Sequence, residues 1–145
     1  MALKDIHFFS EDIDFSIKNK KKIREWIAAV IKQEGFRRIG ELSFVFCSDA
    51  YLLEINRQYL AHDTYTDIVT FDSSQDGNTI AGDVFISVDR TRENAIKFGV
   101  SQTDELHRVL IHGILHLCGY QDKDKRDKSR MRAKEDEALS LRGFV

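Results

Sequence analysis

The sequence has no proline, only two cysteines and no long hydrophobic segment, and each absence excludes a class of protein. No internal repeat or interdomain linker divides the 145 residues, a length at which one core is stable without cross-links. No apolar run approaches the roughly 20 residues that span a bilayer. The opening MALKDIHFFS also lacks the basic start and apolar centre of a signal peptide. We therefore expect one cytoplasmic domain, residues 1–145, with no membrane contact.

The chain also has little net charge and no regular cysteine spacing. A formal charge of -2 excludes a surface that is basic throughout, so any contact with RNA must be local. Cys47 and Cys118 lie inside apolar stretches, which favours buried thiols in a reducing compartment over a disulfide. With 42% hydrophobic and 32% charged residues, the composition is that of a folded protein and excludes a disordered one.

The hydrophobic pattern predicts an α/β (α+β) fold in which helices cover a small mixed sheet of about four strands. After an apolar opening, Ile6 to Phe9, the pattern gives helix, strand, helix, strand, strand, helix and helix. The expected elements are a helix capped by Ser16 and stopped by Gly35, strand 41–47, helix 49–60 capped by Ser48, strands 67–71 and 80–88, a helix from Ser101 to Gly119, and helix 128–142. In the strand 80–88, Val84, Ile86 and Val88 alternate with Asp83, Phe85 and Ser87, which indicates a partly open sheet face able to line a cleft.

The helix that ends near Gly119 carries the chemistry. His112 and His116 are four residues apart and so project from one helical face within reach of a single ion. Gly119 allows the chain to double back, which lets Asp122 complete three ligands around an open fourth position. The pattern H-x3-H-x2-G-x2-D therefore predicts a catalytic metal site, with zinc as the expected ion and other divalent metals as alternatives.

Other interpretations of these residues stay open. A pair of helical histidines is often an ordinary core or surface feature, but the apolar neighbours of this pair indicate buried imidazoles that need partners. Gln121 and Asp124 are alternatives to Asp122 as the third ligand, and the Cys118 thiolate is another. His107 lies off the face of His112, which favours a surface group or a group supporting the ligands.

An open metal site favours hydrolysis, since a bound metal lowers the pKa of its water and polarises a phosphoryl or carbonyl oxygen. Zinc proteases place a glutamate directly after the first histidine, where this chain has Gly113. RNA cleavage does not require that base, because RNA contains its own 2'-hydroxyl nucleophile. The residues therefore favour RNA over peptide as substrate.

Three segments resemble one known family. HGILHLCGYQD (112–122) is similar to the signature H-G-x-L-H-L-x-G-Y-D-H of the YbeY endoribonucleases that mature ribosomal RNA. INRQYLAHDTYTDIVTF (55–71) resembles the family's L-N-x-x-Y-R-x-x-D-x-P-T-D-V-L-S-F, and AGDVFIS resembles its L-G-D-I-x-I strand. The resemblance covers about half of the chain, in the family's order.

The resemblance implies an α/β fold, a zinc-type site and a single-strand-specific endoribonuclease that matures the 3' end of 16S rRNA on the small ribosomal subunit. By position, His112 and His116 match the first two metal ligands, whereas Asp122 stands where the family has a third histidine. An anionic third ligand weakens the preference for zinc and admits manganese or magnesium.

A second departure is Leu60, which replaces the arginine of the family's L-N-x-x-Y-R. Arg57, one turn earlier, is the candidate catalytic residue in its place, with a solvated helix residue as the alternative. The basic run from Lys123 to Lys134 is a candidate phosphate contact or, equally, a charged helix face. The competing functions are a non-catalytic ribosome-assembly or RNA-binding factor and, against the evidence of Gly113, a metalloprotease.

Overall fold

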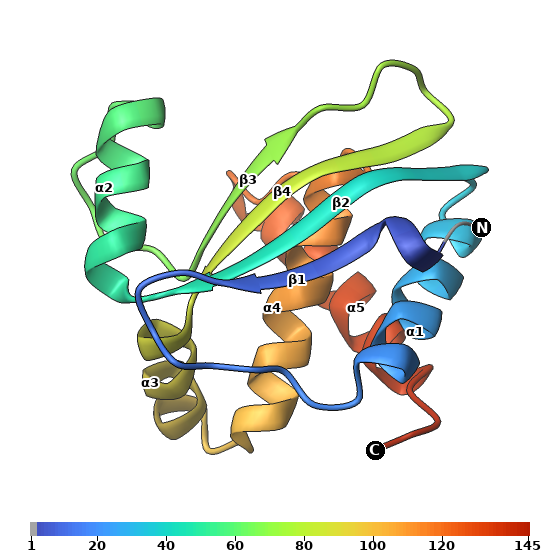
Figure 1. Ribbon diagram of the computed structural model, residues 1–145. Helices are drawn as coiled ribbons and strands as arrows, with labels where there is room; N and C mark the ends of the chain where they lie inside the picture. The colour runs from blue at the N-terminus through green and yellow to red at the C-terminus, as the bar shows by residue number, and fades with distance from the viewer. Residues whose placement is uncertain (1–2) are drawn as a thin grey trace.

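Four strands form one mixed sheet in the order β1-β2-β4-β3 (Figure 1). β1, β2 and β4 run parallel, while β3 pairs antiparallel with β4 as a hairpin. The strands are β1 Ile6–Ser10, β2 Arg38–Cys47, β3 Ile68–Asp72 and β4 Thr79–Ser87. These bounds come from a computed structural model that describes residues 3–145, so the first two residues of the predicted domain lie outside the described residues. The predicted mixed sheet of about four strands is confirmed.

Five helices accompany the sheet, preceded by a short 3-10 turn at Leu3–Asp5. They are α1 Lys20–Gln33, α2 Asp49–Leu60, α3 Val88–Phe98, α4 Gln102–Leu117 and α5 Lys125–Ser140. Helices α1, α4 and α5 gather on one side of the sheet, whereas α2 stands at one end of it (Figure 1). The α/β class that the sequence predicted is therefore confirmed, with helix layers around a small sheet.

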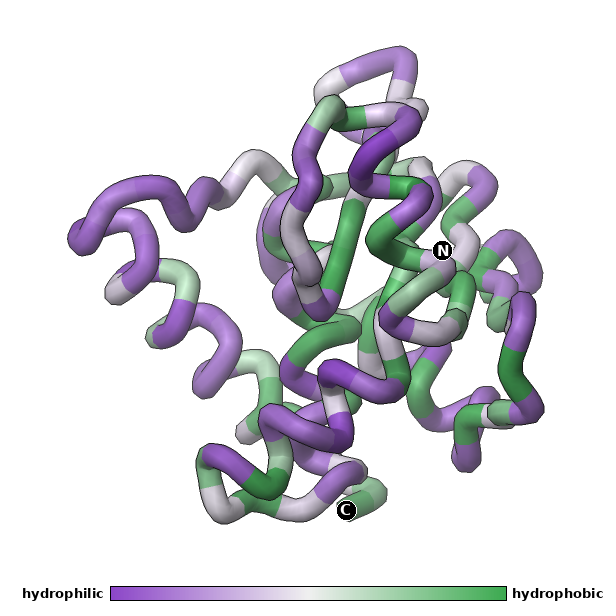
Figure 2. Tube along the Cα trace, turned by 90° about the vertical axis from the view of Figure 1, so that its left-hand side faces the viewer, coloured by the Kyte–Doolittle hydropathy of each residue, from purple (hydrophilic) through white to green (hydrophobic). Residues whose placement is uncertain are grey.

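The main core lies between the sheet and the layer of α1, α4 and α5. As the alternating pattern of β2 predicts, Leu42, Phe44 and Phe46 all face this core, with at most 1% of their surface exposed. Val84 and Ile86 of β4 join them without any exposed surface. In Figure 2 the hydrophobic stretches of the trace lie mostly in the interior and the hydrophilic ones along the outline.

The opposite face of the sheet is only partly covered, as the alternation in β4 predicts. Asp83 is exposed there. Phe85 is half-buried and packs against a small cluster in which Leu52 of α2 contacts Cys47 and Val69 of the sheet. Ser87 departs from the expectation, because it is fully buried and caps α3 by accepting a hydrogen bond from the backbone N–H of Arg90. Val88 likewise starts α3 instead of ending the strand.

Two elements were missed in the predicted order, and the starts of two helices were predicted wrongly. The missed elements are strand β1, at the apolar opening, and helix α3, which follows β4 without a loop. The first helix begins at Lys20 and not at Ser16, because Ile17 is buried in the core and Asn19 takes a left-handed conformation, φ 62°, at the turn into α1. Helix α5 starts at Lys125, three residues before its predicted start, because Asp124 caps it.

Among residues 3–145, no helix is both long enough and apolar enough to cross a membrane.

Candidate metal centre

Helix α4 places the two histidines, and glycines at two positions shape their surroundings. A Cβ on Gly113 would lie 2.7 Å from Cγ1 of Val84 and 2.9 Å from Cδ1 of Ile68, so a glycine here lets α4 approach the sheet closely. At the other end, Gly119 has φ +106° and its N–H donates to the carbonyl of His116. This left-handed turn sends the chain back toward the helix, as predicted.

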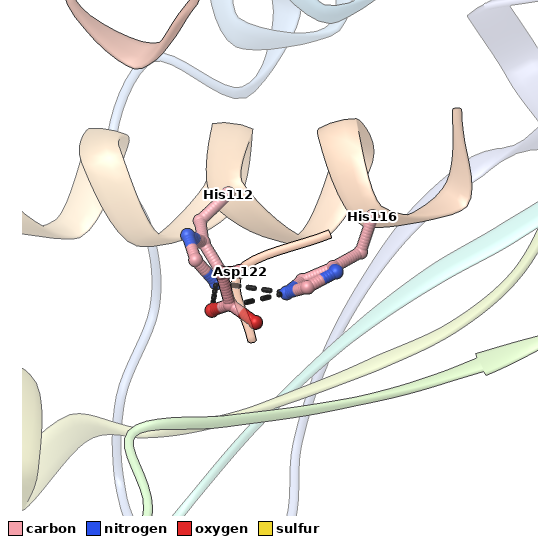
Figure 3. Close-up of side chains that lie close together, drawn as sticks. All are labelled: His112, His116 and Asp122. Carbon is pink, nitrogen blue, oxygen red and sulfur yellow. Dashed lines mark hydrogen bonds and ion pairs between the residues drawn. The ribbon is translucent and has the colours of Figure 1, made fainter. Parts of the chain in front are cut away.

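The turn brings Asp122 up to the two imidazoles, and the three side chains converge (Figure 3). Nε2 of His112 lies 3.0 Å from Nε2 of His116. Oδ2 of Asp122 lies 3.2 Å from the first of these nitrogens and 3.6 Å from the second. The three residues singled out by the sequence therefore meet in one place.

In each ring, the hydrogen bond made by Nδ1 decides that Nε2 is the nitrogen able to bind a cation. Nδ1 of His112 lies 2.6 Å from Oε2 of Glu135, and Nδ1 of His116 lies 3.0 Å from the backbone carbonyl of Tyr120. Both partners accept, so each Nδ1 carries the proton and donates it. Each Nε2 is left with its lone pair toward Asp122, and three electron-rich atoms face one another.

A divalent ion fits this arrangement. Ligands about 2.0–2.2 Å from a tetrahedral zinc ion lie about 3.3–3.6 Å from each other, close to the three separations found here. Two imidazoles and one carboxylate are a common donor set for catalytic zinc, in which the fourth position is kept for water or substrate. Asp122 is 40% exposed, so solvent reaches the group from its side.

Charges around the group act differently on the two histidines. Burial opposes protonation of His112, yet the hydrogen bond and the negative charge of Glu135 raise its pKa above the ordinary value. Burial lowers the pKa of His116, and the nearby charge on His112 lowers it further. The pair therefore does not hold two protons easily, which favours a shared cation over two separate charges.

Glu135, on α5, is a functional residue that the sequence analysis missed. It is buried, and it joins His112 to Arg108, whose Nη1 donates to its Oε1 at 2.9 Å. Nη2 of Arg108 donates at 2.7 Å to Asp136. A signal was present, since Met131, Glu135 and Ala138 share one face of α5 at helical spacing, which places a carboxylate on a buried stripe.

Arg57 does not join the metal group. It lies on α2, where its guanidinium is 2.7 Å from Glu54 and contacts Asp63, and it is 46% exposed. Leu60, in the position of the family's arginine, is also exposed on this helix. The structure thus places the predicted catalytic arginine in an ion-pair network at the surface.

The remaining candidates take other roles. His107 is buried, and not a surface group as one interpretation had it; it packs against Trp26 and its Nδ1 accepts from Arg142. Cys118 is partly buried and lies outside the ligand group, and burial raises the pKa of its thiol to about 12. Cys47 is buried, and neither cysteine forms a disulfide, as expected. The basic run follows Asp122 into α5.

The chain is similar to known proteins over nearly its whole length. The family described as Endoribonuclease YbeY matches residues 5–143. The endoribonuclease YbeY of Cytophaga hutchinsonii is 50% identical over 99% of this chain and all of its own length. That of Christiangramia forsetii is 50% identical over 94% of each chain.

A solved structure shows the same fold. The solution structure of TM1509 from Thermotoga maritima covers 93% of this chain and 87% of its own, with a TM-score of 0.64 and 25% sequence identity. The predicted family, fold class and metal-dependent chemistry are in accord with these matches. With a near-complete family match and half of its residues shared with curated relatives, the chain belongs to the YbeY endoribonuclease family.

Proposed function

We propose that this chain is a single-strand-specific endoribonuclease whose metal ion is held by His112, His116 and Asp122. The observation that carries the proposal is the convergence of two Nε2 atoms and one carboxylate oxygen within 3.6 Å of each other, at the positions of the family signature. Zinc is the expected ion, because two of the three donors are imidazoles. Manganese is the alternative that the carboxylate favours.

A bound divalent ion supplies polarisation of a phosphoryl oxygen and charge for the transition state. The chain itself holds and orients the ligands. Glu135 fixes the ring of His112, and the Tyr120 carbonyl fixes that of His116. The 2'-hydroxyl of RNA supplies a nucleophile within the substrate.

Protease chemistry is disfavoured by the packing of α4. A zinc protease needs a glutamate at the position of Gly113, but Gly113 lies against Val84 and Ile68, where even a methyl group is crowded. A glutamate at this position would enter the core instead of the cleft.

For the substrate, we infer the 3' end of 16S rRNA on the small ribosomal subunit, in the cytoplasm. The support is the likeness to relatives named as endoribonucleases, together with the basic run that adjoins Asp122. Arg57 remains the proposed phosphate-binding residue on the α2 side. Its pairing with Asp63 and Glu54 means that RNA has to compete with two carboxylates for the guanidinium.

A non-catalytic ribosome-assembly factor is the second candidate. The observation that favours it is Leu60, which leaves α2 without the arginine of the family pattern. Under this hypothesis the chain binds small-subunit components but shows no metal-dependent turnover.

Elemental analysis of the purified protein, before and after chelation, tests the metal, and cleavage of a single-stranded oligonucleotide with the sequence of the rRNA 3' end tests the activity. The variant His112→Ala is expected to lose bound metal and all cleavage while remaining folded by circular dichroism. His62→Ala, which alters an exposed histidine between α2 and β3, is the matched control and keeps both. Cleavage that survives His112→Ala or exhaustive chelation would overturn the proposal.

A further inference from the structure

A cleft of about 290 Å³ opens beside the metal group, between α3, α4 and α5. His112, Asp122 and Glu135 form one end of it, and most of the remaining wall comes from residues outside the metal group. Three features of that wall match three parts of a nucleotide: an exposed aromatic ring, two cations without partners and a buried carboxylate without a donor.

The aromatic ring is that of Phe98, at the C-terminal end of α3. It lines the cleft and is 53% exposed, although phenylalanine usually lies in the core. An exposed ring on the wall of a cleft is a platform on which an unpaired base can stack, an interaction worth about 1–3 kcal/mol per base. Single strands offer such bases and duplexes do not.

The two cations are Lys128 and Arg132, one turn apart on α5. Both side chains are exposed and line the cleft, and within residues 3–145 neither forms an ion pair. Their neighbours differ: Arg108 is paired with Glu135 and Asp136, and Lys134 with Glu34. Although the charge of Arg132 acts on Glu105 in the same cleft, no carboxylate of the described residues lies within ion-pair distance of either cation, so both can contact phosphates of a strand.

The carboxylate is that of Glu105, on the same face of α4 as His112 and seven residues before it. Its residue is only 6% exposed, yet in the described part of the chain its side chain has no hydrogen bond and no ion pair within 4 Å. Burial raises its pKa and the charge of Asp67 adds to this effect, whereas the charges of Arg108 and Arg132 oppose it. Among the described residues no side-chain oxygen is both buried and without a hydrogen-bond partner, so the Glu105 carboxylate opens onto the cleft, where a donor from outside can reach it.

We propose that this cleft is the subsite for one nucleotide next to the cleaved bond, an inference that rests on the proposed endoribonuclease function. Phe98 stacks on the base, and Lys128 and Arg132 hold its phosphates. Glu105 accepts hydrogen bonds from the base edge, which selects a base with an amino group.

Guanine fits the carboxylate best, because its adjacent imino and amino groups present two donors to two oxygens. Adenine and cytosine offer one amino group. Uracil presents a single N–H between two carbonyl oxygens, and these oxygens repel the carboxylate. The subsite therefore ranks guanine first and uracil last.

The test uses fluorescent 11-residue oligouridines with or without one central guanine, measured for binding by the metal-loaded protein and for cleavage. The parent is expected to bind the guanine oligomer about tenfold more tightly than oligouridine, in line with the worth of a bidentate contact, and to cut at one fixed distance from the guanine. Glu105→Gln is expected to lose this preference, because the guanine oligomer binds more weakly while oligouridine, no longer repelled by the carboxylate, binds as tightly as to the parent or more tightly. Glu93→Gln, on the exposed side of α3, is its matched control.

Two further variants test the platform and the cations. Phe98→Ala is expected to weaken binding of both oligomers about tenfold, whereas Ile96→Ala, on the same helix and outside the cleft, leaves it unchanged. Lys128→Ala with Arg132→Ala is expected to lower the slope of log Kd against log salt by roughly 1.4. The pair Lys21→Ala and Lys22→Ala, exposed on the first turn of α1 and outside the cleft, serves as its control.

The outcomes separate the two proposals. Cleavage by the parent with no effect of Phe98→Ala, or a guanine preference retained by Glu105→Gln, overturns the subsite and leaves the endoribonuclease function intact. Binding that shows all three dependences, without any cleavage by the metal-loaded parent, supports the subsite and overturns the proposed activity.

Discussion

The carboxylate of Glu135 lies 2.6 Å from Nδ1 of His112, which joins the last helix of the fold to the metal group. Because Glu135 is buried, its charge is stabilised only by the partners it contacts, His112 and Arg108. The contact therefore orients the imidazole and also ties α5 to α4.

Replacing Glu135 with glutamine tests this orientation. The amide can still accept from Nδ1 but has no charge, so His112 becomes a weaker ligand, and we expect zinc affinity to fall about 10–100-fold. Isothermal titration with zinc measures the change. Glu137→Gln, half-exposed on the same helix, is the control. Equal affinities for the parent and Glu135→Gln would mean that the contact has no part in metal binding.

Replacing Asp122 with histidine tests the unusual third ligand. A third imidazole removes one negative charge from the site and makes it softer, so the ratio of zinc affinity to manganese affinity should rise relative to the parent. Competition between the two metals, followed by mass spectrometry of the native protein, gives this ratio. An unchanged ratio would show that the side chain at position 122 does not coordinate the ion.

Replacing Gly113 with alanine tests the close approach of α4 to the sheet. The added Cβ would lie 2.7 Å from Val84, so we expect the free energy of unfolding to fall by about 1–3 kcal/mol despite the better helix propensity of alanine. Urea denaturation measures it. Gly77→Ala, in the β3–β4 turn where no atom lies within 4 Å, is the matched change and should be nearly neutral.

The buried His107 should make stability depend on pH. Burial and the charge of Arg142 lower its pKa from 6.5 to about 4, so between these values the unfolded chain takes up a proton that the folded chain does not. Stability is full above pH 6.5 and falls as the pH drops toward 4. From pH 7.5 to 5 this one group should cost about 2 kcal/mol.

Urea denaturation of the parent and of His107→Gln at pH 7.5 and pH 5 isolates the loss of unfolding free energy that His107 causes, because other groups titrate alike in the two proteins. Glutamine keeps an acceptor for Arg142 but does not titrate. The loss of stability on acidification should be smaller in the variant. An equal loss in both proteins would show that His107 does not cause it.

The sequence predicted best where a strong period coincided with capping residues. Helix α4 has both, since Ser101 caps its start and Gly119 turns its end, and its two histidines and Asp122 meet as expected. Helix α3 has capping residues at both ends, Ser87 and Gly99, but lacks a strong apolar period. The side chains that it buries, Val88, Thr91 and Ala95, are small and one of them is polar, so large apolar residues do not mark its buried face, and its cap Ser87 is also the last residue of β4.

Residues that act on the site from other helices could not be placed from spacing alone. Glu135 follows His112 by 23 residues, and only the packing of α5 on α4 brings them together. Glu105 and Phe98 join one cleft for the same reason, because α3 and α4 are adjacent in the fold. Local patterns predict which face of a helix is apolar, but the partner of that face is a property of the tertiary structure.

The hydrogen bond between Glu135 and His112 also determines when the metal group can be completed during synthesis of the chain. The metal ligands emerge from the translating ribosome before α5, and until residues 125–140 have followed and folded, the imidazole of His112 lacks its orienting carboxylate. The metal group is therefore complete only when the last helix of the chain has folded against α4.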